Sequence, residues 1–358
     1  MYNKLLKKKL HFFLIFIILI FNNIFFRYSN SNIKKKIGII GLEHSQNVGN
    51  NLLKYAIFIK LTELGFDPYI IGRKAKNHNI SFIKNVVNLR LIKNFSEIKE
   101  NEFDILMVNS DQTWRKANCF FYDVAFLRFA EKWKIPKFIY GTSLGLEEWK
   151  FNKEDEIIAK HLLKNFKGIS VRELGSVELI EKHLGIKAQF VLDPTLLINN
   201  KYYINLIKDY KSNIINKINN KKYIFAYIIR NNSNIRKYLS IAKKKLNSKL
   251  FILNMHINNQ VKEFLYGVIN SKAVITDSFH GTIFSLIFKK PFISFIKNGY
   301  KECRFNSLDK IFNIRNRIFD FEENPPVSLL EQNLIINKKN LIILKRESIK
   351  YIKKNLYY

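Results

Sequence analysis

The chain has 358 residues, 47% of them hydrophobic, so it is long enough for two packed domains and too apolar for a disordered protein. Lysine and arginine number 61 against 29 aspartates and glutamates, and the formal net charge of +32 favours anionic partners. The basic residues are scattered and form no nucleic-acid-binding signature, which argues against a nucleic-acid partner.

The first 33 residues form a hydrophobic amino-terminal segment. Residues 10–26 are nearly all apolar, and lysines flank them at positions 7–9 and 34–36. The apolar run is slightly shorter than the roughly 20 residues of a membrane span, and no small-residue cleavage site follows it. We expect residues 1–33 to form a hydrophobic helix that anchors or associates with the inner, cytoplasmic face of the cell membrane, an anionic surface. A buried structural helix is the alternative.

Alternating strands and helices follow. An apolar strand at 36–41, a helical pattern at 52–61 and a strand at 66–71 predict a βαβ unit. Further strands are expected at the apolar runs 103–108, 138–140, 168–171 and 189–192. We therefore expect an amino-terminal α/β domain over residues 34–198.

A second α/β unit follows an Asn- and Lys-rich stretch at 199–221, which is expected to be a linker or a peripheral helix pair. Strands are expected at 223–229, 250–253, 273–276 and 291–295, within a carboxy-terminal α/β domain at 222–300. Residues 301–358 are expected to form a helical region. Two Rossmann-like domains facing a cleft place the ligand site between them.

Polar residues at 276–282 fall between an apolar strand and a helical pattern. Such turns lie at the carboxyl ends of strands, where the free N–H groups of the following helix attract anions. His280 is expected on this rim, with the hydroxyls of Thr276, Ser278 and Thr282 nearby. The alternative is a capped helix start with Asp277 or Ser278 as the N-cap and His280 merely hydrogen-bonded.

The loop at 41–50 is expected to form another wall of the site. Gly49 allows backbone N–H groups to approach a ligand, and Asn47 and Asn50 can bind sugar hydroxyls or phosphate oxygens. The alternative is helix capping by Asn47. His44 is a second candidate for acid–base work. Trp114 could stack on a sugar, although a core position is commoner for tryptophan.

Five motifs occur in the order of a known family. They are Asn47-Val48-Gly49-Asn50-Asn51-Leu52-Leu53-Lys54-Tyr55-Ala56, Phe103-Asp104 with Asn109-Ser110-Asp111-Gln112-Thr113-Trp114, Ser170-Val171-Arg172-Glu173, Leu192-Asp193-Pro194-Thr195, and Thr276-Asp277-Ser278-Phe279-His280-Gly281-Thr282. Through them, most of residues 36–320 resembles the polysaccharide pyruvyl transferase family. The resemblance implies a fold similar to GT-B glycosyltransferases and transfer of pyruvate from phosphoenolpyruvate onto two sugar hydroxyls, giving a cyclic ketal.

This chemistry needs a proton-transfer group and a cationic clamp for phosphate. We expect His280 to transfer protons and Arg172 to hold phosphate or carboxylate. For Arg172, the alternative is a salt bridge to Glu173 or to a neighbouring helix. The expected substrate-binding residues are Asn47, Gly49, Asn50, Ser110, Asp111, Thr276, Asp277, Ser278, Gly281 and Thr282. Phosphoenolpyruvate would be a donor substrate, and no cofactor is expected. Cys119 and Cys303 stand apart without metal-ligand spacing, so no metal site is expected.

One position departs from the family pattern. The best understood members carry an arginine two residues before the motif histidine, where this chain has Ser278. A hydroxyl cannot neutralise phosphate, so either Arg230, Lys289, Arg304 or another base substitutes, or the donor differs. Three functions are weighed: a pyruvyl transferase acting on a cell-surface polysaccharide or lipid-linked saccharide acceptor, a glycosyltransferase using a nucleotide sugar, and a non-catalytic glycan-assembly protein. The sequence does not specify an oligomeric state.

Overall fold

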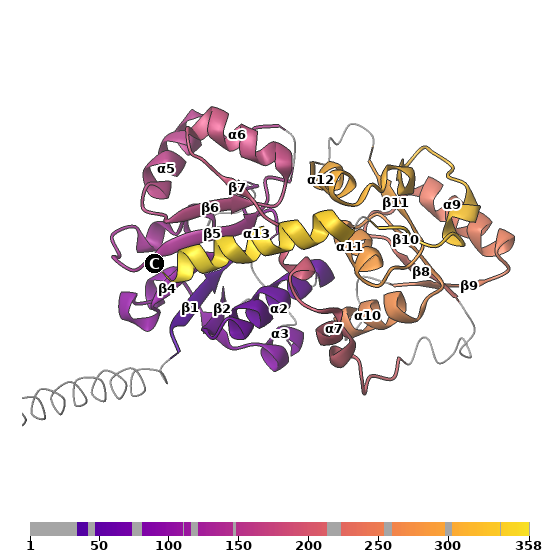
Figure 1. The fold of residues 1–358 in the computed structure, drawn as a ribbon, viewed down its shortest axis with the longest axis horizontal. Helices are drawn as coiled ribbons and strands as arrows, with labels where there is room; N and C mark the ends of the chain where they lie inside the picture. The colour runs from indigo at the N-terminus through magenta and orange to yellow at the C-terminus, as the bar shows by residue number, and fades with distance from the viewer. Residues whose placement is uncertain are drawn as a thin grey trace, which may run out of the picture.

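The computed structural model describes residues 34–41, 47–73, 81–109, 111–115, 121–145, 148–212, 223–253, 260–297, 303–336 and 338–357. The chain folds into two parallel β-sheets, each surrounded by helices, which confirms the predicted pair of Rossmann-like domains (Figure 1). The expected hydrophobic helix at 1–33 lies outside the described residues. None of the helices in the described ranges combines the length and apolar character that a membrane crossing needs.

The first domain contains a seven-stranded sheet with the order β3-β2-β1-β4-β5-β6-β7. Its strands are β1 (Lys36–Ile40), β2 (Asp67–Arg73), β3 (Leu89–Ile92), β4 (Ile105–Val108), β5 (Lys137–Thr142), β6 (Gly168–Val171) and β7 (Gln189–Phe190). Its helices are α2 (Val48–Glu63), α3 (Ser81–Val86), α4 (Phe121–Phe126), α5 (Lys153–Leu163) and α6 (Leu174–Leu184). The central strands are buried, because helices cover both faces of such a sheet.

The second domain contains a five-stranded sheet with the order β12-β11-β10-β8-β9. Its strands are β8 (Tyr223–Tyr227), β9 (Lys249–Ile252), β10 (Ala273–Thr276), β11 (Phe292–Ile296) and β12 (Ile318–Asp320). The helices α9 (Ser233–Lys245), α10 (Gln260–Asn270), α11 (Phe279–Ile287) and α12 (Cys303–Phe312) pack around it. The expected domain boundary at residue 300 falls inside this unit, because β12 pairs with β11 and completes the sheet.

The carboxy-terminal helix α13 (Lys338–Leu356) returns to the first domain. Figure 1 shows it in yellow, running from the second domain across to the first. The Tyr351 hydroxyl donates to the Ile139 carbonyl at 2.8 Å, and the Leu192 amide donates to Ser348 Oγ at 2.9 Å. Residues 301–358 therefore contribute to both domains rather than forming a separate helical region.

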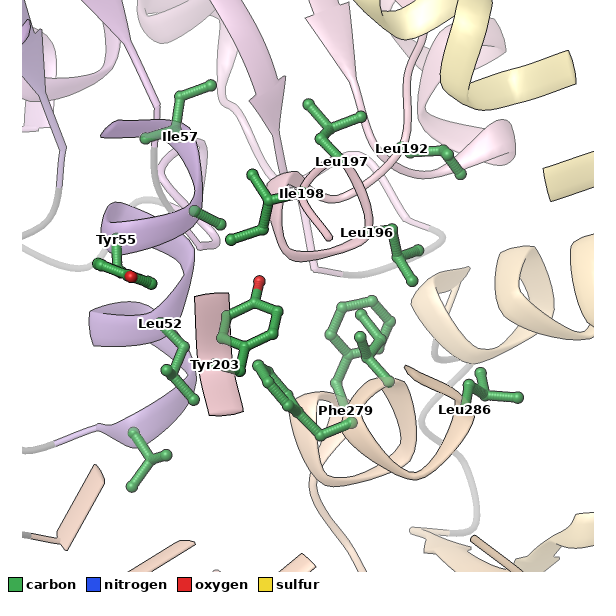
Figure 2. Close-up of a cluster of buried hydrophobic side chains, with 14 of the residues drawn as sticks. Leu52, Tyr55, Ile57, Leu192, Leu196, Leu197, Ile198, Tyr203, Phe279 and Leu286 are labelled. Atoms are coloured by element: carbon green, nitrogen blue, oxygen red, sulfur yellow. The ribbon is translucent and has the colours of Figure 1, made fainter. Parts of the chain in front are cut away.

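The two domains share one hydrophobic core. The 3-10 turn η4 (Pro194–Leu196) and helix α7 (Asn200–Leu206) lie between α2 and α11. Figure 2 shows Tyr203 among Leu52 of α2, Leu196 of η4 and Phe279 of α11. The buried Tyr203 hydroxyl donates to the Thr195 carbonyl at 2.9 Å. The start of the expected linker is thus part of the interdomain core, which supports the strand ends on either side.

Candidate active site between the domains

The first turn of α11 follows the carboxyl end of β10, as the sequence pattern predicts. Ser278 is the N-cap, and its Oγ accepts a hydrogen bond from the Gly281 amide at 3.3 Å. Thr276 Oγ1 donates to the Tyr227 carbonyl at 2.7 Å and accepts from the Ser278 amide at 3.0 Å. The hydroxyls of Thr276 and Ser278 are therefore already engaged in shaping this turn.

Asp277 connects β10 to the segment after β8 rather than capping α11. Its carboxylate accepts hydrogen bonds from the backbone amides of Ile229 and Arg230, at 2.6 and 2.8 Å. Burial raises the pKa of Asp277 above its usual value, although these amides and the Arg230 charge act in the opposite direction. The carboxylate orders the rim of the second sheet.

Gly281 and Thr282 pack inside the second domain. A Cβ on Gly281 would lie 2.2 Å from Thr276 Oγ1, so glycine permits the helix to approach the strand. Thr282 is fully buried, and its Oγ1 lies 2.6 Å from Ser294 Oγ on β11. Both positions fit the close docking of α11 on its sheet.

The side chain of His280, in the second domain, contacts the first domain. A Cβ on Gly49, in the first turn of α2, would lie only 2.1 Å from His280 Nδ1, so the imidazole packs directly on the α2 backbone. His280 Nε2 lies 3.7 Å from Asp193 Oδ2, and both side chains are almost fully buried. In the described part of the chain, no atom makes a hydrogen bond to Nε2.

Arg172 follows β6 and holds the carboxylates beside His280. Its NH1 donates to Asp193 Oδ2 at 2.5 Å, its NH2 bonds Asp111 Oδ1, and its Nε lies 3.5 Å from Glu173 Oε1. The Arg172 side chain is 0% exposed, so these carboxylates compensate a buried charge. The alternative salt bridge to Glu173 is thus present. Two further ion pairs join Arg172 to Asp111 and Asp193, which are more distant in the sequence.

Arg304 of α12 adds a second cation to this cluster. Its NH1 lies 3.7 Å from Asp111 Oδ1. The guanidinium groups of Arg172 and Arg304 lie 5.0 and 5.2 Å from the centre of the Phe279 ring, within the range of cation–π attraction. At 17% exposure, the Asp111 side chain is the most accessible carboxylate of the group.

The pKa values of the three carboxylates diverge. Burial is the largest influence on Asp193 and Asp111 and opposes their ionisation, but the Arg172 charge and the other nearby partners together outweigh it and lower the pKa of both. His280 acts in the same direction on each. At Glu173, burial prevails over Arg172 and raises the pKa. The cluster therefore keeps Asp193 and Asp111 as anions next to an imidazole and two arginines.

The other predicted residues occupy different positions. Asn47 is the N-cap of α2, as its alternative predicts, and its Oδ1 accepts from the Asn50 amide at 3.0 Å. Ser110 and His44 lie outside the described residues. Trp114 packs inside the first domain against Phe126, with ring centres 5.3 Å apart. In the described ranges, no group of His, Cys, Asp or Glu side chains is placed to hold a metal ion.

Asp193 was missed as a site residue by sequence reasoning, although its motif was identified. Its Oδ1 caps η4 by accepting from Thr195, while Oδ2 faces Arg172 and His280. A signal was available, because an aspartate directly after a predicted strand falls at the same sheet edge as Arg172. Chemically, the cluster offers an imidazole next to a carboxylate and an arginine pair that can hold an anion.

Solved structures of nucleotide-sugar enzymes share this fold. The chain is similar to the UDP-GlcNAc 2-epimerase from Methanocaldococcus jannaschii, with 14% identity, a TM-score of 0.53, and coverage of 88% of this chain and 99% of that chain. It is also similar to S. aureus MnaA in a co-structure with UDP, with 13% identity, a TM-score of 0.51, and coverage of 91% and 97%. These likenesses show the GT-B-like fold that the sequence predicted.

A comparison with curated proteins finds no match. The sequence model named Polysaccharide pyruvyl transferase matches residues 47–299, which is well over half of the chain and contains the α2 start, Arg172, Asp193 and the α11 turn. The chain belongs to the polysaccharide pyruvyl transferase family and is a transferase.

Proposed function

We propose that this protein transfers the pyruvyl group of phosphoenolpyruvate onto two hydroxyls of a sugar in a cell-surface polysaccharide or its lipid-linked precursor. The observation that carries the proposal is the interdomain cluster in which His280 meets Asp193 beside two arginines, in a chain of this family. The product would be a cyclic ketal, and inorganic phosphate would be released.

The reaction sets clear demands on the site. C2 of phosphoenolpyruvate gains bonds to two sugar oxygens and loses its bond to the phosphate oxygen. The C2=C3 double bond becomes a single bond, and its electron pair binds a proton at the methylene carbon C3. Each sugar hydroxyl loses its proton as its oxygen bonds to C2. One proton balances the new C–H bond, and the other leaves with phosphate. A group that exchanges protons near neutral pH and a cation for the phosphate are therefore needed.

We assign proton transfer to His280. Its Nε2 has no hydrogen-bond partner among the described residues, so the imidazole can still bond a reacting group. Asp193 Oδ2 lies 3.7 Å from Nε2, so its negative charge faces the imidazole while a hydroxyl proton is transferred. Asp193 would therefore be a positioning residue, held in place by Arg172 and Thr195.

We assign to Arg304 the neutralisation of the donor phosphate, which the uncharged hydroxyl of Ser278 cannot provide. Among the candidate replacements, Arg304 lies against the Phe279 ring at the start of α11, whereas Arg230 lies against Phe321, 5.7 Å from its ring centre. Lys289 follows the opposite end of α11. Arg172 is enclosed by three carboxylates, which supports a role in holding the site together. The phosphate would then contact Arg304.

Thermal-shift titration tests the donor. Phosphoenolpyruvate should raise the melting temperature, and Arg304→Gln should weaken its binding by about tenfold or more, because a charge-assisted hydrogen bond is lost. Arg315→Gln is the matched control, since Arg315 is exposed on another turn of the second domain. Equal losses in both variants would contradict the assignment of Arg304.

A glycosyltransferase using a nucleotide sugar is the second candidate, and the UDP bound in the similar MnaA structure favours testing it. Stabilisation by UDP without stabilisation by phosphoenolpyruvate would support this alternative. A non-catalytic glycan-assembly protein is the third candidate. It requires that cells carrying His280→Ala still produce unaltered glycan, whereas the transferase requires loss of the ketal.

A further inference from the structure

A basic pocket opens in the first domain, away from the catalytic cluster. Its volume is about 530 Å³, and it is lined by the carboxyl ends of α5 and α6 and the start of β6. Lysine supplies all of its charged side chains: Lys160, Lys164, Lys167 and Lys187. Its apolar lining comes from Leu163, Phe166, Ile169, Leu184 and Ile186. No carboxylate lines the pocket among the described residues, so it suits an anion attached to an apolar body.

The pocket lies at the edge where the parallel strands of the first sheet begin. β6 is three strands from β1, which corresponds to about 14 Å at the usual spacing of parallel strands. The end of α13 lies at this edge as well, because Asn355 packs on Gly168 and the Tyr357 hydroxyl donates to the Leu64 carbonyl. The catalytic cluster lies at the opposite edge, where the strands end. Figure 1 places the carboxyl terminus at the side of the first domain farthest from the second domain.

We propose that this edge faces an anionic membrane surface and that the lysine pocket binds the phosphate-bearing headgroup of a phospholipid. The chain enters the described structure at this edge through Lys34, Lys35 and Lys36, all exposed. The segment before them carries the apolar run at 10–26, so the same edge joins an apolar segment to a basic surface. Lys353 and Lys354 at the end of α13 are also exposed.

Three acidic residues near this edge are engaged by other groups. Asp104 accepts from the Lys36 amide at 2.7 Å, and Glu131 lies 2.7 Å from His161 Nε2. Glu102 bonds Arg90 at 2.6 Å. These contacts reduce the competition that carboxylates offer to a lipid phosphate for the lysines.

Helix dipoles give a simpler reason for some of the lysines. Lys160 and Lys164 lie at the carboxyl end of α5, where positive charge stabilises the last turn. Lys167 and Lys187 come after their helices have ended, so the dipole does not explain why they complete the pocket. This alternative predicts a change in stability without a change in lipid binding, and the two roles can therefore be separated.

Vesicle co-sedimentation of the full chain tests the proposal. The probes are phosphatidylcholine vesicles with and without phosphatidylglycerol, and the variant is Lys160→Gln/Lys164→Gln/Lys187→Gln. Each lysine near an anionic surface contributes about fivefold to binding, so affinity for the anionic vesicles should fall by on the order of 100-fold. Affinity for the neutral vesicles should stay unchanged, because it depends on the apolar segment.

The matched control is Lys243→Gln/Lys244→Gln/Lys245→Gln, which removes the same charge from exposed positions at the end of α9. This variant should retain most of the anionic-vesicle affinity. Equal losses in both variants would overturn the proposal, because net charge alone would then explain binding. A lower melting temperature with unchanged vesicle binding would overturn it in favour of the dipole role. If the Lys160→Gln/Lys164→Gln/Lys187→Gln variant loses binding of inorganic phosphate but keeps binding of vesicles, the pocket is a site for a free anion and the lipid proposal is overturned.

Discussion

His280 and Asp193 come from different domains, and a single glycine sets how closely they approach. Because the imidazole packs on the backbone at Gly49, any side chain there must push His280 away from its place beside Asp193. The spacing of the sequence motifs predicted that Gly49 and His280 face one site. It could not predict their direct contact, because residues far apart in the chain meet only once both domains are folded.

Gly49→Ala should reduce transferase activity on the order of 100-fold, since a displacement near 1 Å can have that effect on a catalytic group. Gly175→Ala is the matched control. Gly175 occupies the same second position of its helix, α6, and a Cβ there meets nothing within 4 Å. The control should keep full activity, and its stability should change by less than about 1 kcal/mol. Activity assays with circular dichroism distinguish the variants, and an active Gly49→Ala protein would contradict the observed packing.

Asp193 also contributes stability that depends on pH. Its pKa is lower in the folded chain than in the unfolded chain, where aspartate has a pKa of about 3.9. A lowered folded pKa means that the contribution is complete well above pH 3.9 and is lost as the pH falls toward the folded value. Asp193→Asn should reduce the free energy of unfolding by about 3 kcal/mol at pH 7, because a buried arginine loses one partner.

The difference between the wild type and Asp193→Asn should shrink below about pH 4, as urea denaturation at a series of pH values would show. Asp209→Asn removes the same charge from an exposed position of the same chain and should have little effect. A difference that stays constant down to pH 2.5 would indicate that the ionised form of Asp193 is not what stabilises the fold.

At the scale of elements, the strand–turn–helix unit from β10 to α11 was predicted with nearly its observed bounds. Its apolar strand and polar turn are local features, so the sequence shows them directly. β3 and β12 were not predicted. β3 is four residues long and mostly half-buried, and β12 has three residues, so neither displays a clear apolar run or alternation. Their pairing with β2 and β11 comes from tertiary structure.

The cap of α11 can be tested separately from catalysis. Ser278→Ala should lower the free energy of unfolding by about 1 kcal/mol, because the Gly281 amide loses its acceptor. Ser278→Asp should restore most of this stability, since aspartate is an equally good N-cap. Chemical denaturation of the three proteins provides the comparison. If Ser278→Asp proves no more stable than Ser278→Ala, the serine has a role other than capping.

At the scale of the whole molecule, both sheets contribute to one hydrophobic core, and α13 connects the carboxyl terminus back to the first domain. The sequence predicted two domains and a cleft, because alternating strands and helices are visible in its pattern. It assigned residues 199–221 to a linker or a peripheral helix pair, whereas Tyr203 is buried between the domains. Asparagine and lysine dominate that stretch, and one buried tyrosine does not create a detectable period.

The central claim is that the interdomain cluster around His280 forms a pyruvate ketal. The most direct measurement is mass spectrometry of a glycan fraction after incubation with the protein and carbon-13-labelled phosphoenolpyruvate. We predict a labelled, pyruvate-sized mass increase that is lost in folded His280→Ala protein and retained in His161→Ala, whose exposed imidazole lies by Glu131. Phosphate release without sugar modification, or ketal formation by the His280→Ala variant, would contradict the account.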